Sequence, residues 1–299
     1  WWYLDLPLYY RIKRVLLRSD HNKKYGKLGL HSRLRHMRLF LQIRACFAYL
    51  YLVVKSIVRF IYGSFVLSVF HRRSMSSILI LSSSYSWRAT NRSCAKNTSR
   101  LRYKDEMVGN IIECLLEHKN TVIACDVHEE FPPGVGMKKL IEKNILQGSV
   151  WRPIESYLSL KVIKKTLIDW SYYNKIGKRI IKSARFRNLF HIDGSDRYNS
   201  FDDVINNFIS YQLFEIILHI HLINRAVEAE NVKVILTNCD HCRFGRTALF
   251  SAKMCNLPAI SVQMATISEN SREYIYTAEE MRTLPLADTY AVNGEYTYD

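Results

Sequence analysis

Short runs of apolar residues, separated by polar segments, dominate the chain from Ser76 onward. They are rich in Ile, Leu and Val, and runs of this length are typical of strands buried on both faces of a parallel sheet. Each of the four clearest runs has seven or eight residues: Ser77–Ser84, Thr121–Val127, Val232–Cys239 and Pro258–Met264. A later run, Leu286–Asn293, predicts the beginning of one more strand.

Segments with helical spacing of apolar residues lie between these predicted strands. Tyr103–His118 separates the first two strands and Gly245–Cys255 the last two, with Tyr85–Arg102 as a polar loop. Strand, helix and strand in this order form a βαβ unit, so the sequence predicts an α/β fold with a Rossmann-like parallel sheet. Two longer helical stretches are predicted in the middle of the chain: Ser156–Arg187, and a helix from Ser200 to about Glu230 with Asp202 and Asp203 in its first turn.

Residues 1–75 follow another pattern, and we expect them to form a basic amphipathic helical leader. Lys55 and Arg59 interrupt the apolar segment Leu39–Phe70, so it lacks the roughly 20 uncharged residues that span a membrane. On a helix, Arg44, Lys55 and Arg59 fall within about 60° of one another. This favours a helix lying in the membrane interface with its cations toward anionic headgroups, and the alternatives are ordinary core helices with snorkelling bases or a true span.

The charge distribution points to a polyanionic partner. The 299 residues carry a net charge of +16, and residues 1–102 hold 20 Lys and Arg against 2 acids. An anionic membrane surface, contacted through residues 1–75, fits this asymmetry. No zinc-finger, RNA-recognition or basic-zipper motif is present, so no nucleic-acid partner is predicted. Seven cysteines without a secretory signal favour a reducing compartment, and we expect a cytoplasmic protein that is peripheral on the inner face of the cell membrane.

Residues that follow the predicted strands are the candidates for ligand binding, because open α/β sheets bind ligands at the carboxyl ends of their strands. They are Trp87 and Arg88 after the first strand, His128 after the second, Asn238, Asp240, Arg243 and Arg246 after the third, and Gln263 after the fourth. An Arg beside the free N–H groups of a helix start suits a phosphate or carboxylate, although Arg246 has a solvated first-turn residue as its alternative. No G-x-G-x-x-G or P-loop motif occurs, so neither motif predicts dinucleotide or ATP binding.

Three residues are candidates for acid–base chemistry: His128, Glu155 and Asp240. The ordinary pKa of His lies near neutrality, although a lone His is often structural. Glu155 follows Pro153-Ile154 in a predicted loop, where capping or solvation is its alternative. Cys125-x-x-His128 and Cys239-x-x-Cys242 have zinc-ligand spacing, but they lie far apart in the sequence and buried thiols explain them as well. We therefore predict no metal site and no cofactor.

The stretch from Val232 to Asp299 resembles the inter-domain region of two-domain GT-B glycosyltransferases, of the capsule and surface-polysaccharide type that includes CDP-glycerol glycerophosphotransferases. The resemblance rests on Asp240 in an acidic turn, Arg246 in the helix after it, Leu257-Pro258-Ala259-Ile260, Gln263, Tyr274, Ala287-Asp288 and Val292-Asn293-Gly294-Glu295. Trp151–Tyr157 also looks like a segment of the first domain of these enzymes. One departure is that Met264-Ala265 follows Gln263 where the family has His-Gly, so the family's candidate active-site imidazole is absent there.

The resemblance implies that residues 76–286 are the first, acceptor-side lobe and that residues 287–299 begin the crossover to a second lobe, which this sequence lacks. The implied activity is transfer of a sugar or an alditol phosphate from a nucleotide-activated donor to a surface polysaccharide or a lipid-linked acceptor. Such a reaction needs a base for the acceptor hydroxyl and positive charge for the leaving phosphate. A nucleotide-sugar epimerase-like relative and a catalytically silent binding fragment are the alternatives.

Overall fold

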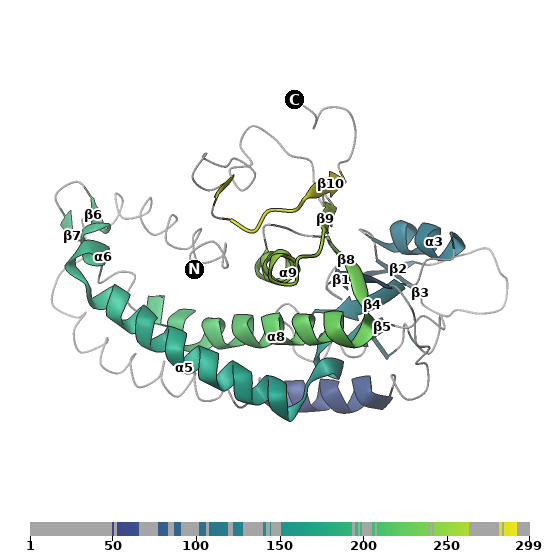
Figure 1. Ribbon diagram of the computed structural model, residues 1–299, viewed down its shortest axis with the longest axis horizontal. Coiled ribbons are helices and arrows are strands. Elements are labelled where there is room, and N and C mark those ends of the chain that lie inside the picture. Colours follow the sequence, from purple (N-terminus) through teal and green to yellow (C-terminus); the bar gives the residue numbers. More distant parts are fainter. Residues whose placement is uncertain are drawn as a thin grey trace. The chain divides into compact units, whose positions relative to one another are not determined.

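The structure is a computed structural model, and it describes a large part of the chain (Figure 1). The described residues are 50, 53–65, 77–82, 87–90, 102–105, 108–118, 122–127, 140–141, 144, 151–192, 195–196, 198, 205–206, 208–238, 240, 242–262, 281–282 and 284–291. The chain divides into two compact units, one from residues 1–57 and 160–218 and the other from residues 58–159 and 219–299.

The second unit contains a six-stranded sheet in which every neighbouring pair is parallel. Its strands are β1 (Ser77–Ser82), β4 (Val122–Asp126), β5 (Trp151–Pro153), β8 (Val232–Thr237), β9 (Ala259–Val262) and β10 (Thr289–Ala291). They lie side by side in the order β10-β9-β8-β1-β4-β5. Numbered along the chain, this is the order 3-2-1-4-5-6 of a Rossmann-like fold, so the predicted fold class is confirmed.

The central strands have apolar side chains on both faces because helices cover both faces of the sheet. Ile80, Ala124 and Leu236, from three neighbouring strands, belong to one buried apolar cluster. The partly buried Ile111, Ile112 and Leu115 of α3 (Gly109–Glu117) pack against that cluster. The helix α9 (Arg243–Met254) follows β8 and contacts β8 and β9, and Figure 1 shows α3 and α9 on opposite sides of the strands. The central strands are thus largely apolar because both of their faces are buried, as predicted from the continuous apolar runs.

The segment between β1 and α3 differs from the prediction. The strands β2 (Trp87–Thr90) and β3 (Arg102–Asp105) form an antiparallel pair where we expected a polar loop and the first turn of a helix. The helix α3 begins only at Gly109. Asp105 is the last residue of β3, and Val108 directly precedes α3. The backbone N–H of Val108 donates to Asp105 Oδ1 over 3.1 Å, and this bond fixes the turn between the strand and the helix.

The strand β5 was predicted as a loop, and that prediction is wrong. Its three residues pair with β4, and it forms one edge of the sheet, where Pro153 is tolerated because an edge strand needs fewer N–H donors. Asn144 supports this edge through its side chain: Nδ2 donates to the Trp151 carbonyl oxygen over 2.7 Å and Oδ1 accepts from Trp151 N over 3.0 Å. A strand of three residues is too short to show periodicity in the sequence.

The helix over residues 53–65 has an orientation opposite to the one predicted. Arg59 is 1% exposed and forms ion pairs with Asp126 and Glu155, and Lys55 lies 4.0 Å from Glu215, so neither cation points to solvent or to lipid headgroups. A Cβ on Gly63 would lie 2.0 Å from Ser156 Oγ, so this position requires glycine for close approach to the 3-10 helix η4 (Ile154–Tyr157). Within the described segments, no helix combines the length and apolar character that crossing a bilayer requires.

The described part of the first unit is mainly helical and contains most of the predicted helical stretch Ser156–Arg187. Its helices are α5 (Leu160–Lys182), α6 (Ala184–Asn188), the π-helix η6 (Phe208–Gln212) and the start of α8 (Leu213–Glu230), and its strands β6 (His191–Ile192) and β7 (Ser195–Asp196) form a short antiparallel pair. Ser183 accepts a hydrogen bond from Phe186 N and so separates α5 from α6. The predicted long helices are thus observed, while Ser200, Asp202 and Asp203 lie outside the described residues.

Candidate ligand site at the carboxyl edge of the sheet

The boundary between β1 and β8 is the topological switch point of the sheet. Along the chain, β1 is followed in the sheet by β4 and β5, which lie on one side of β1. The later strands β8 and β9 lie on the other side of β1. Connections therefore diverge at the carboxyl ends of β1 and β8, and this divergence leaves a crevice in Rossmann-like folds. Ser82 ends β1 and Thr237 ends β8, so these two residues mark the candidate site.

A buried cluster of polar side chains fills this edge. Ser82 Oγ donates to Asp105 Oδ2 over 2.5 Å, and Asn238 Nδ2 donates to Ser82 Oγ over 3.1 Å. All three side chains belong to residues that are at most 1% exposed. The cluster joins the ends of β1, β3 and β8, which are far apart in the sequence. It therefore fixes the position of the residues that border the switch point.

Two oxygen atoms of β8 and the residue after it have no hydrogen-bond partner among the described residues. They are Thr237 Oγ1 and Asn238 Oδ1, and both are buried. A buried polar atom without a partner costs about 1–3 kcal/mol, so proteins rarely retain one without a reason. Both oxygens can accept a hydrogen bond, and the Thr237 hydroxyl can also donate one. The arrangement suits a ligand that carries hydroxyl groups.

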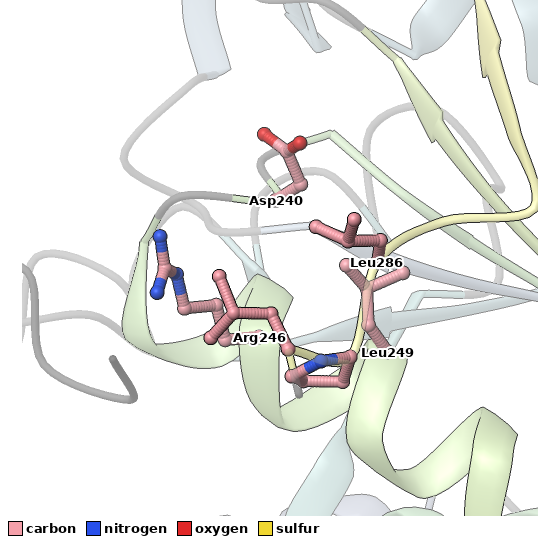
Figure 2. Close-up of a pocket in the computed structure, with 6 residues that line it drawn as sticks. Asp240, Arg246, Leu249 and Leu286 are labelled. Carbon is pink, nitrogen blue, oxygen red and sulfur yellow. The ribbon is translucent and has the colours of Figure 1, made fainter. Parts of the chain in front are cut away.

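The turn after β8 and the start of α9 bring three predicted site residues together. Asp240, Arg243 and Arg246 are 5%, 9% and 4% exposed, so the alternative of a solvated first-turn residue is wrong for Arg246. Figure 2 shows Asp240 in the turn, with Arg246 and Leu249 on α9 and Leu286 on the segment that leads to β10. These residues line a small pocket with about 10 Å³ of free volume, room for one water molecule. Cations at a helix N-terminus favour a bound anion.

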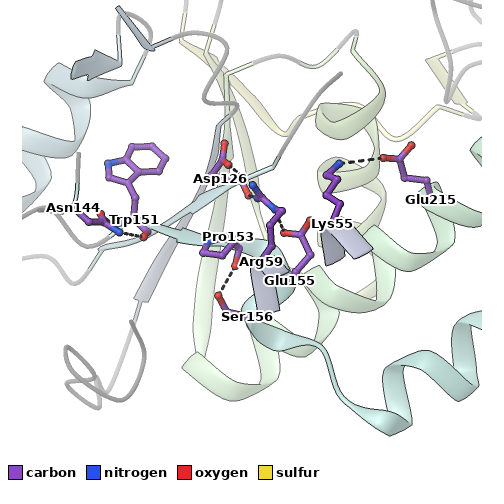
Figure 3. Close-up of polar contacts among 9 residues, drawn as sticks. All are labelled: Lys55, Arg59, Asp126, Asn144, Trp151, Pro153, Glu155, Ser156 and Glu215. Carbon is purple, nitrogen blue, oxygen red and sulfur yellow. Dashed lines mark hydrogen bonds and ion pairs between the residues drawn. The ribbon is translucent and has the colours of Figure 1, made fainter. Parts of the chain in front are cut away.

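The β4–β5 side of the same edge is held by a buried ion-pair cluster (Figure 3). Arg59 Nη1 lies 3.0 Å from Asp126 Oδ2, Arg59 Nε lies 2.7 Å from Glu155 Oε2, and Arg59 Nη2 donates to the Asp126 carbonyl oxygen over 2.8 Å. Burial by itself lowers the pKa of the Arg59 guanidinium, but the Glu155 and Asp126 carboxylates raise it above its ordinary value. Arg59 thus stays charged and forms an ion pair with each of the two carboxylates.

A second buried cluster lies beside β5. Arg152 Nη1 lies 2.8 Å from Glu230 Oε1 and donates to the Tyr157 hydroxyl over 3.1 Å, while that hydroxyl donates to Glu230 Oε1 over 2.9 Å. Burial raises the pKa of the Tyr157 hydroxyl. Burial also raises the pKa of the neighbouring Cys125 thiol to about 12, so Cys125 stays protonated and unreactive at neutral pH.

The remaining predicted site residues have different positions in the structure. Glu155 is 2% exposed and belongs to the Arg59 cluster, so the alternative of a solvated carboxylate is wrong, and its catalytic role stays a prediction. Trp87 and Arg88 lie in β2, and the backbone of Trp87 pairs with that of Asp105, close to the switch point. His128 and Gln263 lie outside the described residues.

Ser82, Asp105 and Thr237 were not among the predicted site residues. Ser82 and Thr237 are small polar residues inside apolar runs, and their position near the carboxyl ends of those runs was the available signal. Asp105 fell inside a predicted helix, so no pattern connected it with Ser82. Asp288, one of the residues of the resemblance, has a structural contact: its Oδ2 accepts from Ala259 N over 2.8 Å and so joins β9 to the start of β10.

The described residues contain no group of three or more His, Cys, Asp or Glu side chains that could hold a metal ion, while His128 and Cys239 lie outside them. Comparisons with protein-family models, with curated proteins and with solved structures find no match to this chain.

Proposed function

We propose that this chain is the acceptor-side lobe of a glycosyltransferase, which moves a sugar or an alditol phosphate from a nucleotide-activated donor to a surface polysaccharide or a lipid-linked acceptor. The fold supports this proposal, because a parallel sheet with the order 3-2-1-4-5-6 offers its ligand crevice at the β1–β8 boundary. A fold alone hosts many activities, so the proposal depends on the residues at that boundary.

The observation that carries the proposal is a pair of buried oxygens at this boundary, Thr237 Oγ1 and Asn238 Oδ1, that have no hydrogen-bond partner within the described part of the chain. Sugars and alditols present several hydroxyl groups, and each hydroxyl can donate one hydrogen bond and accept others. A ligand of this class carries the hydroxyl donors that both oxygens lack among the described residues. The hydrogen bond from Asn238 Nδ2 to Ser82 also holds the Asn238 amide so that its Oδ1 atom keeps one orientation.

The residues at the start of α9 supply the charge that the reaction needs. Asp240 is our candidate for the base that removes the proton from the attacking hydroxyl, and Arg243 and Arg246 favour the negative charge that develops on the leaving phosphate. The hydroxyl oxygen then forms a bond to the anomeric carbon, or to phosphorus in alditol-phosphate transfer. The bond to the nucleotide part breaks, and its electron pair leaves with the phosphate.

A catalytically silent binding lobe is the second candidate. The ion pair between Glu155 and Arg59 favours it, because that carboxylate is 2% exposed and neutralised. The two candidates differ in turnover: a silent lobe binds the glycan or the donor without releasing nucleotide.

A donor and acceptor screen on the whole chain tests the proposal. We expect the chain to bind a polyol or glycan acceptor, and free nucleotide to be released from CDP-glycerol or one of a panel of nucleotide sugars when a donor-binding lobe is also present. Thr237→Val should lower ligand affinity about fivefold, the equivalent of one hydrogen bond. Thr166→Val is the matched control, because Thr166 Oγ1 is also buried without a partner, on α5 in the other unit.

The outcomes separate the candidates. Nucleotide release that is lowered by Thr237→Val and unchanged by Thr166→Val supports the transferase. Binding of an acceptor without nucleotide release, when a donor-binding lobe is present, supports the silent lobe. Equal behaviour of both variants, or no binding of any donor or acceptor, contradicts the proposed site.

A further inference from the structure

The helix over residues 53–65 is amphipathic in an inverted sense, with its polar side toward the protein. Its inward residues include Lys55, Ser56, Arg59 and Gly63, and the last three are buried. Tyr62 is also inward: it packs against the buried apolar cluster and accepts a hydrogen bond from Asn144. Arg59 and Lys55 are engaged by carboxylates. Helices of globular proteins normally turn an apolar stripe inward and keep charges in water. Both cations of this helix therefore pair with buried acids of the protein. Most of the apolar side chains of the helix lie on the other side and are exposed.

The outward side is an apolar stripe. Seven large apolar residues of this helical segment are each between 49% and 63% exposed: Leu50, Val53, Val54, Ile57, Val58, Ile61 and Phe65. At about 100° per residue they cover an arc about 140° wide, on which Ser64 is the polar exception. Scattered exposed apolar residues need no explanation, but a continuous stripe of this size marks a surface that contacts something apolar.

The charge of the surrounding sequence identifies the chemistry of the partner. Residues 1–49 and 66–76, which flank the helix on both sides, carry 13 Lys and Arg against 2 acids. Each basic residue near an anionic lipid surface contributes about 1 kcal/mol of attraction. An apolar helix face with strongly basic flanks is the combination that binds helices into the interface of anionic membranes. A nucleic acid fits the flanks but leaves the apolar stripe uncovered.

We propose that the apolar stripe of the helix over residues 53–65 docks into the headgroup and acyl boundary of an anionic membrane, whose negative charge complements the basic composition of the flanking sequence. Lys55 and Arg59 on this helix are paired with carboxylates of the protein, so only the opposite side of the helix is left to contact lipid, and the helix lies in the interface and does not cross the bilayer. The buried ion pairs of Arg59 then tie the docked helix to the Rossmann-like unit. This proposal does not rest on the transferase chemistry, and it stands if no donor is found.

Vesicle flotation of the whole chain tests the proposal. We expect the protein to float with vesicles that contain about one third phosphatidylglycerol or phosphatidylserine and to remain behind with pure phosphatidylcholine, because both charge and apolar burial are needed. Replacing two residues of the stripe, Ile57→Glu with Ile61→Glu, should lower the partition coefficient at least tenfold. Both side chains are exposed, so the fold should survive, and an unchanged thermal unfolding midpoint checks this.

A matched variant separates the stripe from the general effect of added negative charge. Leu116→Glu with Met254→Glu introduces the same two charges at apolar residues of similar exposure, 54% and 52%, on α3 and α9. It should float nearly as well as the wild type. Equal flotation of both double variants overturns the proposal. A second outcome also overturns it: the wild type does not bind anionic vesicles and sediments as a dimer, and only the stripe variant is a monomer. The stripe is then covered by a second copy of the chain.

Discussion

The β4–β5 half of the sheet and the β1–β8 boundary treat buried polar groups in opposite ways. On the β4–β5 half, Arg59 is paired with Asp126 and Glu155, and Arg152 is paired with Glu230 and Tyr157. At the β1–β8 boundary, Thr237 Oγ1 and Asn238 Oδ1 have no partner among the described residues, although Ser82 on the neighbouring strand is bonded to both Asp105 and Asn238. Both regions lie in one sheet, yet the polar groups of the β4–β5 half are bonded to one another, while two oxygens at the β1–β8 boundary are left for another partner.

The difference teaches how to separate structural polar residues from candidate functional ones in this sheet. Buried charges with complete sets of partners hold the helix over residues 53–65 and η4 in place, and removing one partner leaves an uncompensated charge. The buried oxygens Thr237 Oγ1 and Asn238 Oδ1, which have no partner among the described residues, lower the stability of the fold and hold no other element in place. The first kind should respond to substitution through folding, and the second kind through ligand binding.

The largest expected effect is on the ion-pair half. Arg59→Met removes the guanidinium that pairs with the buried Asp126 and Glu155, and we expect it to lower the free energy of unfolding by about 3–5 kcal/mol. Urea unfolding of the whole chain measures this. Arg225→Met is the control, because the Arg225–Glu228 pair is exposed and should contribute less than about 1 kcal/mol. If both variants lose the same stability, the Arg59 cluster is not the structural element that we describe.

A second effect on this half depends on pH. Cys125 has its pKa raised from 9.0 to about 12 by burial, so between these values the unfolded chain loses a proton that the native chain keeps. The associated stability is complete at low pH and is lost as the pH rises through this range, by about 2 kcal/mol between pH 8 and pH 10.5. Tyr157 adds to the loss in the same direction, because its folded pKa is also raised.

Comparison with Cys125→Ala isolates the thiol. The stability difference between wild type and variant should shrink by about 2 kcal/mol over that pH interval, since the Tyr157 contribution is common to both proteins. Guanidinium unfolding at the two pH values measures it. A constant difference means that the Cys125 thiol ionises as readily in the folded protein as in the unfolded chain, and that this half of the sheet is more open to water than the structure indicates.

The bonded part of the β1–β8 boundary should show an intermediate effect. Ser82→Ala removes the donor to Asp105 and the acceptor of Asn238, and we expect a loss of about 2 kcal/mol. Ser77→Ala is matched in residue type, strand and burial, but Ser77 makes one hydrogen bond, to the Glu230 carbonyl oxygen, so its loss should be about 1 kcal/mol. Thermal unfolding compares the two. Equal losses indicate that Ser82 does not organise the cluster.

The sequence predicted the strands that bury both faces, because Ile80, Ala124 and Leu236 lie in long apolar runs, and it predicted the parallel Rossmann-like sheet from their spacing. It could not predict β5, whose three residues carry no periodicity. It predicted that Asp240, Arg243 and Arg246 lie together, because they follow one strand closely.

The partners of Arg59 were beyond sequence reasoning, since no local pattern connects that residue with carboxylates 67 and 96 positions away. The same limit applies to Ser82 and Asp105, which meet only once β3 has formed. The amphipathic pattern over residues 53–65 was recognised correctly, but its direction was not. A helical wheel shows that charges and apolar residues occupy different sides, and only the buried carboxylates of the folded unit decide which side faces inward.

The smallest expected effect has the opposite sign and is the sharpest test of the comparison. Thr237→Val keeps the shape of a buried side chain and removes a hydroxyl that has no partner among the described residues, so we expect the free energy of unfolding to rise by up to about 1 kcal/mol. Every truncation on the ion-pair half should lower it. Thr237→Ser keeps the hydroxyl, removes a methyl group and should lower stability instead. Urea unfolding without ligand measures both variants. A loss of stability in Thr237→Val equal to that in Thr237→Ser means that the hydroxyl is satisfied inside the protein, and the boundary is then as saturated as the β4–β5 half.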